Sequence, residues 1–189
     1  VRYKSENALS DINRLYKMED VPVAKGAFGR VYKACSITDE DTLFAIKHLD
    51  ISSMKAKQIN EISSEVQILN SLDHPNIVKY YEIYEDREAL YIVMEQCVGY
   101  TIYDKIAAGQ RMTETEICKI AQQLLRAINH CHAHKITHRD IKLENIIVND
   151  YGECKLIDFG LSKTATSEQI LKSMAGTPYY MAPEILTSR

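Results

Sequence analysis

The chain contains 189 residues, of which 46% are hydrophobic and 26% are charged, a composition typical of a folded globular protein. Its 23 Lys and Arg residues are balanced by 26 Asp and Glu residues, so no basic excess favours nucleic acid or an anionic membrane as a partner. No apolar run is long enough to span a membrane, and residues 1–11 are too polar for a signal peptide. We therefore expect a soluble protein without a nucleic-acid partner.

Cysteine usage indicates the compartment. The 5 cysteines are scattered without a Cys-x-x-Cys pair, at Cys35, Cys97, Cys118, Cys131 and Cys154. An odd, dispersed set is typical of reduced thiols. The sequence therefore predicts a cytoplasmic, reducing environment.

The first half of the chain has patterns typical of β-strands around one helix. Short strands are expected at residues 21–23, 30–36 and 42–48, joined by a glycine-containing loop and a polar turn. A helix should follow, because apolar residues recur at spacings of three and four: Ile59, Ile62, Val66 and Leu69. Residues 77–84 and 90–95 then predict a hairpin with the charged loop 85–88.

The second half is more helical. Thr113 and Glu116 have the spacing of a capping box, so a long amphipathic helix is expected to begin after Thr113. Its apolar stripe is Ile117, Ile120, Leu124, Ile128 and Cys131. A short hairpin should pair residues 146–148 with 155–157. These patterns predict an α+β protein with two lobes, a β-rich first lobe with one long helix and a helical second lobe.

Two features of the first lobe suit a polyphosphate ligand. The segment at residues 24–31 contains Gly26 and Gly29, whose backbone could approach phosphates, although the same spacing is found in ordinary hairpin turns. Lys47 ends an apolar strand, where a lysine is usually solvated. Glu65 lies on the apolar stripe of the following helix, where a carboxylate needs a cation or must take up a proton. An ion pair of Lys47 with Glu65 is one hypothesis, and Glu61, one turn earlier, is the competing partner.

The strongest signal is the run His-Arg-Asp-Ile-Lys-Leu-Glu-Asn at 138–145, followed by Asp-Phe-Gly at 158–160. It gathers two carboxylates, an amide and a lysine: Asp140, Asp158, Asn145 and Lys142. With the upstream glycines, Lys47 and Ala-Pro-Glu at 182–184, these motifs stand in the order found in eukaryotic protein kinases. The chain resembles a kinase catalytic domain over nearly its whole length.

The resemblance implies a two-lobed protein kinase-like fold and roles for individual residues. Asp140, Lys142 and Asn145 would be catalytic, and Asn145 and Asp158 would hold Mg²⁺. ATP would be bound by residues of both lobes, namely Val23, Ala24, Lys25, Gly26, Ala27, Phe28, Gly29, Val31, Ala45, Lys47, Glu65, Met94, Glu95, Cys97 and Ile147. The implied activity is transfer of the γ-phosphate of ATP to protein serine or threonine hydroxyls.

The residues of these motifs are most similar to those of calcium-dependent and calmodulin-dependent protein kinases of protists and plants. This resemblance implies a calcium-sensor module outside this chain. The expected organisation is an N-terminal extension at 1–14, the N-lobe at 15–94, a hinge at 95–99 and a partial C-lobe at 100–189. The C-lobe is expected to lack its later helices after the Ala-Pro-Glu motif. The resemblance thus predicts a stretch of a longer kinase.

Three further interpretations accompany this one. The activation segment offers Thr166, Ser167 and Ser173 as phosphorylation candidates. The histidines at 130–138 suggest a zinc site, but helix packing before the catalytic loop explains them better. The alternative function is a non-catalytic nucleotide-binding pseudokinase or a degenerate fragment with a scaffolding role. The presence of Lys47, Asp140, Asn145 and Asp158 argues against it.

Overall fold

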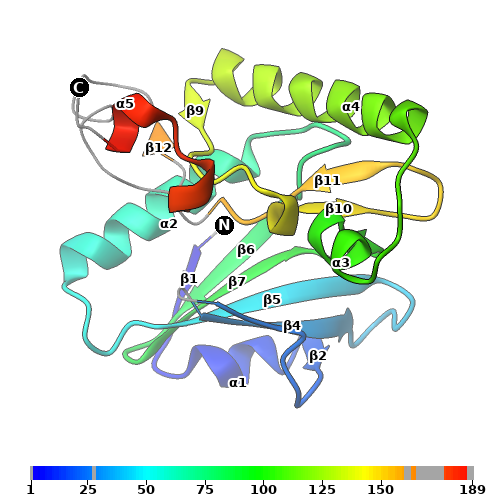
Figure 1. Ribbon diagram of the computed structural model, residues 1–189. Helices are drawn as coiled ribbons and strands as arrows, with labels where there is room; N and C mark the ends of the chain where they lie inside the picture. The colour runs from blue at the N-terminus through cyan, green and yellow to red at the C-terminus, as the bar shows by residue number, and fades with distance from the viewer. Residues whose placement is uncertain (1, 27–28, 160–162, 165–176, 187–189) are drawn as a thin grey trace. The chain divides into compact units, whose positions relative to one another are not determined.

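The computed structural model describes residues 2–26, 29–159, 163–164 and 177–186 (Figure 1). The chain forms two compact units. Unit 1 comprises Val1–Ser71 and Lys79–Cys97, and unit 2 comprises Leu72–Val78 and Val98–Arg189. Strands and helices occur in both, which confirms the expected α+β class.

Unit 1 is built on a 7-stranded sheet. Its strands are β1 (Arg2–Lys4), β2 (Tyr16–Met18), β3 (Ala24–Gly26), β4 (Gly29–Ser36), β5 (Leu43–Asp50), β6 (Tyr80–Glu85) and β7 (Ala89–Glu95). The main path runs β1-β6-β7-β5-β4-β2, and β3 pairs with β4. Neighbouring strands are antiparallel except β1, which is parallel to β6.

Two expected strand boundaries were wrong. The strand predicted at 21–23 lies instead at β3, because Pro22 in that range has no backbone N–H to donate to a sheet. Residues 77–79 do not belong to β6; the Val78 N–H donates to the carbonyl of Leu156 in unit 2 at 3.0 Å. The strand at 30–36 and the β6–β7 hairpin are confirmed.

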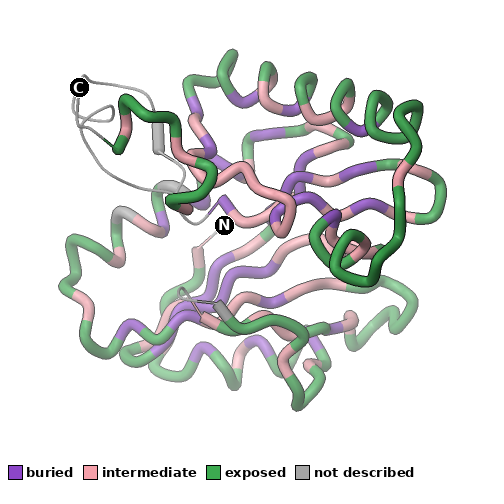
Figure 2. The backbone as a smooth tube through the Cα atoms, viewed as in Figure 1, coloured by how far each residue is buried: buried purple, intermediate pink, exposed green. Residues whose placement is uncertain are grey.

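The two faces of the unit 1 sheet carry different side chains, because successive residues of a strand alternate. One face packs against the short helix α1 (Ala8–Ile12), whose Ala8 and Ile12 are both 0% exposed. The core on this face consists of Ala8, Ile12, Tyr16, Ala34, Ile46, Tyr84, Ala89, Tyr91 and Val93. Figure 2 shows this buried band through the central strands.

Helix α2 (Ala56–Asn70) confirms the predicted apolar periodicity. Val66 and Leu69 are buried, and Ile59 and Ile62 are half-buried. The helix packs along β6. Its apolar stripe therefore holds it against the sheet, as the spacing predicted.

Unit 2 contains the long helix α4 (Glu114–Ala133) and several short elements. These are β8 (Tyr100–Thr101), α3 (Ile102–Ala107), β9 (Ile136–Thr137), η1 (Leu143–Asn145), β10 (Ile146–Val148), β11 (Cys154–Leu156), β12 (Lys163–Thr164), η2 (Pro178–Tyr180) and α5 (Pro183–Leu186). Strands β11, β10 and β8 form one small sheet, and β12 pairs with β9. The predicted hairpin is thus confirmed, with its second strand at Cys154–Leu156.

Helix α4 begins with the predicted capping box. The Thr113 hydroxyl accepts from the Glu116 N–H at 3.3 Å, and the Glu116 carboxylate accepts from the Thr113 N–H at 2.7 Å. Ile120 and Cys131 are buried as expected, but Ile117 is 52% exposed. Strand β11 meets the helix at Ile120 (Cys154 Sγ to Ile120 O, 3.9 Å), and Ile117 lies one turn before this contact.

Residues 72–78 form a loop that is tied to α4 and β11. The Asn76 amide donates to Gln123 Oε1 and to the Cys154 carbonyl, each at 2.8 Å. The Leu156 N–H donates to the Asn76 carbonyl at 2.9 Å. These hydrogen bonds explain why the loop belongs to unit 2 although it follows α2 in the chain. Among the described residues, no helix is long and apolar enough to cross a membrane.

The burial of α1 leads to a stability prediction. We expect Ile12→Ala to lower the free energy of unfolding by about 2–4 kcal/mol, because the removed atoms leave a cavity in the core. Leu9→Ala is the matched control on the same helix, since Leu9 is 38% exposed, and should cost about 0.5 kcal/mol. Urea titration of the two variants measures both values. Equal losses would contradict the assignment of α1 to the core.

Candidate functional site

The motif at 138–145 forms a tight loop between β9 and β10 in unit 2. Arg139 turns the backbone with a left-handed φ of 67°, a conformation that non-glycine residues rarely adopt. The 3-10 turn η1 follows, and its Asn145 is buried. The turn and the left-handed residue together bring the side chains on either side of Ile141 to one point.

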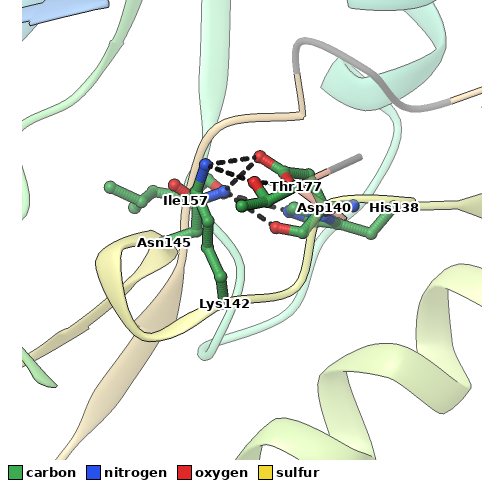
Figure 3. Close-up of polar contacts among 6 residues, drawn as sticks. All are labelled: His138, Asp140, Lys142, Asn145, Ile157 and Thr177. Carbon is green, nitrogen blue, oxygen red and sulfur yellow. Dashed lines mark hydrogen bonds and ion pairs between the residues drawn. The ribbon is translucent and has the colours of Figure 1, made fainter. Parts of the chain in front are cut away.

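The polar contacts of this loop converge on the carboxylate of Asp140 (Figure 3). Lys142 Nζ lies 2.9 Å from Asp140 Oδ2, and Asn145 Nδ2 donates to Oδ2 at 3.1 Å and to the Asp140 carbonyl at 2.8 Å. The Thr177 hydroxyl donates to Oδ1 at 2.7 Å. Lys142 Nζ also donates to the Thr177 hydroxyl at 3.0 Å. Four residues therefore form one closed polar network.

The network favours the charged forms of its two ionisable members. Burial alone would raise the pKa of Asp140, but the hydrogen bonds from Lys142 and Thr177 outweigh it and lower the pKa below its ordinary value. Burial likewise acts to lower the pKa of Lys142, and the hydrogen bond to Asp140 raises it overall. Asp140 is therefore an anion and Lys142 a cation at neutral pH.

His138 anchors the start of the loop. Its Nδ1 accepts from the Asp140 N–H at 3.2 Å, so the ring proton must lie on Nε2, which donates to the Ile157 carbonyl at 3.0 Å. Burial lowers the pKa of His138, which keeps this neutral tautomer. The ring also meets Phe159 edge-on, with centroids 4.4 Å apart. The histidine thus ties Asp140 to the backbone that leads to Asp158.

Asn145 and Asp158 are suitable ligands for a magnesium ion. Since Asn145 Nδ2 donates to Asp140, the amide oxygen is the atom left for a cation, and carboxylate and amide oxygens are what Mg²⁺ prefers. The Ile157 N–H donates to the Asn145 carbonyl at 2.9 Å, which joins the two segments next to Asp158. Within residues 2–26, 29–159, 163–164 and 177–186, no group of three or more His, Cys, Asp or Glu side chains could hold a metal ion.

In unit 1, the strand register brings several predicted nucleotide-binding residues to one face. Val31 is opposite Lys47, and Ala45 is opposite Met94. Alternation along β5 and β7 places these side chains on the face opposite the α1 core, which contains Ile46 and Val93. Lys47 therefore shares a sheet face with three apolar residues that could cover a planar base.

Gly29 begins β4 with a φ of 129°, and a Cβ there would lie 2.1 Å from the His48 carbonyl oxygen. No side chain fits there, so the close approach of the β4 backbone to the β5 backbone requires a glycine at this position. Of the neighbouring predicted residues, Ala24, Lys25 and Gly26 form β3, and the Val23 N–H donates to the Val31 carbonyl at 2.8 Å. Ala27 and Phe28 lie outside the described residues.

The remaining predicted residues are distributed as follows. Glu95 ends β7, and its N–H donates to the Lys79 carbonyl at 2.8 Å. Cys97 is half-buried, and Ile147 lies in β10 of unit 2, opposite Thr101. Glu65 lies on α2, but its side chain and that of Glu61 are outside the described structure, as are Thr166, Ser167 and Ser173. The ion pair of Lys47 and the phosphorylation candidates stay predictions.

Thr177 is the site residue that sequence reasoning did not assign. It lies 37 positions after Asp140, and nothing in the local pattern shows that its hydroxyl reaches the carboxylate. Its only sequence signal is the surrounding Gly-Thr-Pro-Tyr-Tyr run at 176–180, which resembles serine/threonine kinases.

Known proteins are similar to this chain over most of its length. A protein kinase domain model matches residues 19–189. Calcium-dependent protein kinase 5 of Plasmodium falciparum (isolate 3D7) is 39% identical over 189 residues, covering 98% of this chain and 32% of that protein. Calcium/calmodulin-dependent protein kinase type 1 of Caenorhabditis briggsae is 36% identical over 183 residues, covering 95% of this chain and 51% of that protein.

A third relative, the probable serine/threonine-protein kinase MARK-C of Dictyostelium discoideum, is 36% identical over 181 residues, covering 92% of this chain and 23% of that protein. The chain spans about a third of the length of the Plasmodium relatives that it matches. With the family model matching most of the chain and the Asp140 network formed in unit 2, the chain belongs to the protein kinase domain family.

Proposed function

We propose that the protein is an ATP-dependent serine/threonine protein kinase that transfers the γ-phosphate of ATP to hydroxyl groups of protein substrates. The observation that carries this proposal is the Asp140 carboxylate, held as an anion by Lys142, Asn145 and Thr177. A fixed carboxylate with adjacent cation and amide donors is the arrangement that phosphoryl transfer to a hydroxyl requires.

Asp140 would orient the substrate hydroxyl and accept its proton. The hydroxyl oxygen forms a bond to the γ-phosphorus, the bond from that phosphorus to the bridging oxygen of ADP breaks, and the hydroxyl proton passes to the carboxylate. Because its pKa is lowered, Asp140 is ready to accept a hydrogen bond at neutral pH. Its role is mainly orientation, since phosphoryl transfer needs little covalent assistance.

Lys142 would stabilise negative charge on the transferring group. Its ammonium group is already oriented by Asp140 and the Thr177 hydroxyl, so little reorganisation is needed at the moment of reaction. Asn145 and Asp158 would hold magnesium, which neutralises the phosphate charge when it is bound.

Unit 1 would supply the nucleotide contacts. Lys47 would hold the α- and β-phosphates, and Val31, Ala45 and Met94 on the same sheet face would cover the adenine. The β3–β4 turn around Gly26 and Gly29 would approach the phosphates through its backbone. Glu65 of α2 is the proposed partner that orients Lys47.

Replacement of the central carboxylate tests the proposal. We expect Asp140→Asn in the full-length protein to lower kcat by about 100-fold or more, because an amide cannot accept the hydroxyl proton. Phosphorylation of a serine peptide with ATP and Mg²⁺, alongside the matched tyrosine peptide, measures the loss and the acceptor preference. Asp150→Asn is the control, because Asp150 is an exposed carboxylate of the same unit. Unchanged transfer by Asp140→Asn would refute the catalytic assignment.

The Thr177 hydroxyl gives a finer test. Thr177→Val keeps the side-chain volume but removes the donor to Asp140 and the acceptor for Lys142. We expect kcat to fall by about 10-fold or more, because one hydrogen bond to a charged group contributes about 1.5–3 kcal/mol. Thr177→Ser keeps the hydroxyl and should retain most of the activity. If both variants behaved alike, the hydroxyl would have no part in orienting Asp140.

We propose in addition that calcium regulates the activity through segments other than these 189 residues. Two relatives that match most of the chain are named calcium-dependent protein kinases, and this similarity supports the proposal. Removing calcium from the full-length protein with EGTA, at constant Mg²⁺, should slow peptide phosphorylation. Equal rates with and without calcium would contradict this part of the proposal and leave the Asp140 prediction intact.

A further inference from the structure

The segment before the kinase-family match is built into unit 1. The family match begins at residue 19, yet β1, α1 and β2 precede it and contribute to the sheet and its core. Strands β1 and β2 occupy the two ends of the main sheet path, and Figure 1 shows α1 along one face of the strands. Tyr3 stacks on Tyr84 with ring centroids 4.8 Å apart, and the Tyr16 hydroxyl donates to Glu82 at 2.9 Å.

The register places Arg2 at the end of a row of side chains that contains Lys47. Arg2 is opposite Ile83, Ile83 is opposite Ile92, and Ile92 is opposite Lys47. Partners in register lie on the same face of a sheet. Arg2 and Lys47 therefore share one face, three strand spacings or about 14 Å apart.

Arg2 connects this row to α2. Its guanidinium forms an ion pair with Glu85 of β6 through Nη2 and donates to Asn60 Oδ1 of α2 through Nη1 at 3.2 Å. The side chains of Arg2 and Glu85 are only 15% and 14% exposed. A charge that is this shielded from water needs fixed partners. The planar guanidinium can hold two acceptors on different elements at once, which an ammonium group does less well.

Lys4 provides the internal contrast. It lies on the same strand and reaches the same carboxylate, with Nζ 3.7 Å from Glu85 Oε1, but its side chain is 64% exposed. The contacts of Arg2 thus differ from an ordinary surface ion pair, because they join two elements and because the ion pair with Glu85 is largely shielded from solvent, while the bond to Asn60 lies at the surface.

We propose that Arg2 is a positioning residue that holds α2 against the sheet row containing Lys47, so that residues 2–18 are part of the nucleotide-binding unit. This inference rests on the proposed kinase function. Asn60, the α2 residue that Arg2 holds, precedes Glu65 by five positions, about 7.5 Å along the helix axis. Without the Arg2 contact, α2 would be held to the sheet mainly by its apolar stripe, so the helix and the proposed partner of Lys47 would be positioned less firmly.

The test compares variants of the full-length protein that remove either side of the contact. Arg2→Met removes the guanidinium and keeps an apolar stem, and Asn60→Ala removes the acceptor on α2. Alanine is the stronger helix former, so helix propensity alone would slow amide exchange in Asn60→Ala. We expect the opposite, with α2 amides exchanging about 3- to 30-fold faster in both variants. The amides of β7 serve as the internal reference and should keep their rates.

A kinetic readout separates positioning from general destabilisation. If α2 is displaced in part of the molecules, the apparent affinity for ATP falls, so KM for ATP should rise by about 3- to 30-fold. Loss of folded enzyme would instead lower kcat without changing KM. The double variant should be no worse than the more severe single variant, because both remove the same contact.

Arg14→Met is the matched control. Arg14 lies in the same segment, but its side chain is 77% exposed and its ion pair with Asp11 lies within the segment, so α2 exchange and KM should stay at the wild-type values. Wild-type α2 exchange in both Arg2→Met and Asn60→Ala, or an equal effect of Arg14→Met, would overturn the proposal. Since the exchange measurement needs no phosphotransfer, it decides the role of Arg2 even if the kinase proposal fails.

Discussion

The Asp140 side chain is only 10% exposed. A charged carboxylate with so little access to water is stable only where protein groups replace the hydrogen bonds that water would donate. Here the donors are Lys142, Asn145 and Thr177. Each must be in place for the charge to be tolerated, which explains the left-handed backbone at Arg139 and the buried amide of Asn145. The same donors that stabilise the charge also orient it, so one set of contacts serves both folding and the proposed chemistry.

The two faces of the unit 1 sheet also serve two purposes, one in the core and one in the proposed nucleotide site. Alternation of side chains gives Ile46 and Val93 to the core under α1 and Ala45 and Lys47 to the opposite face. A one-residue slip of β5 would exchange these sets, because the side-chain period of a strand is two residues. Packing of the apolar core therefore fixes the face of the sheet on which Lys47 lies.

Local patterns predicted the elements with strong periodicity. The capping box at Thr113 and the apolar stripe of α2 are short-range signals, and both are confirmed. The strand predicted at 21–23 was wrong because Pro22 has no N–H to donate to a sheet, although the flanking valines favour a strand. In the candidate site, the residues at 138–145 could be predicted because they are adjacent in the sequence. The role of Thr177 could not, because it depends on a contact across 37 positions. The edge strand β1 is too short for any periodic signal, and its place beside β6 depends on contacts with residues about eighty positions later.

The loop at 72–78 has a consequence for the order of folding. It interrupts unit 1 in the chain, yet its hydrogen bonds reach Cys154 and Leu156, about eighty residues later. During synthesis these partners emerge long after unit 1 has its last strand, β7. Unit 1 can therefore complete its sheet while this loop still has no anchor, and the loop locks only when β11 has left the ribosome. The segment that leads out of α2 thus becomes fixed after the sheet of unit 1.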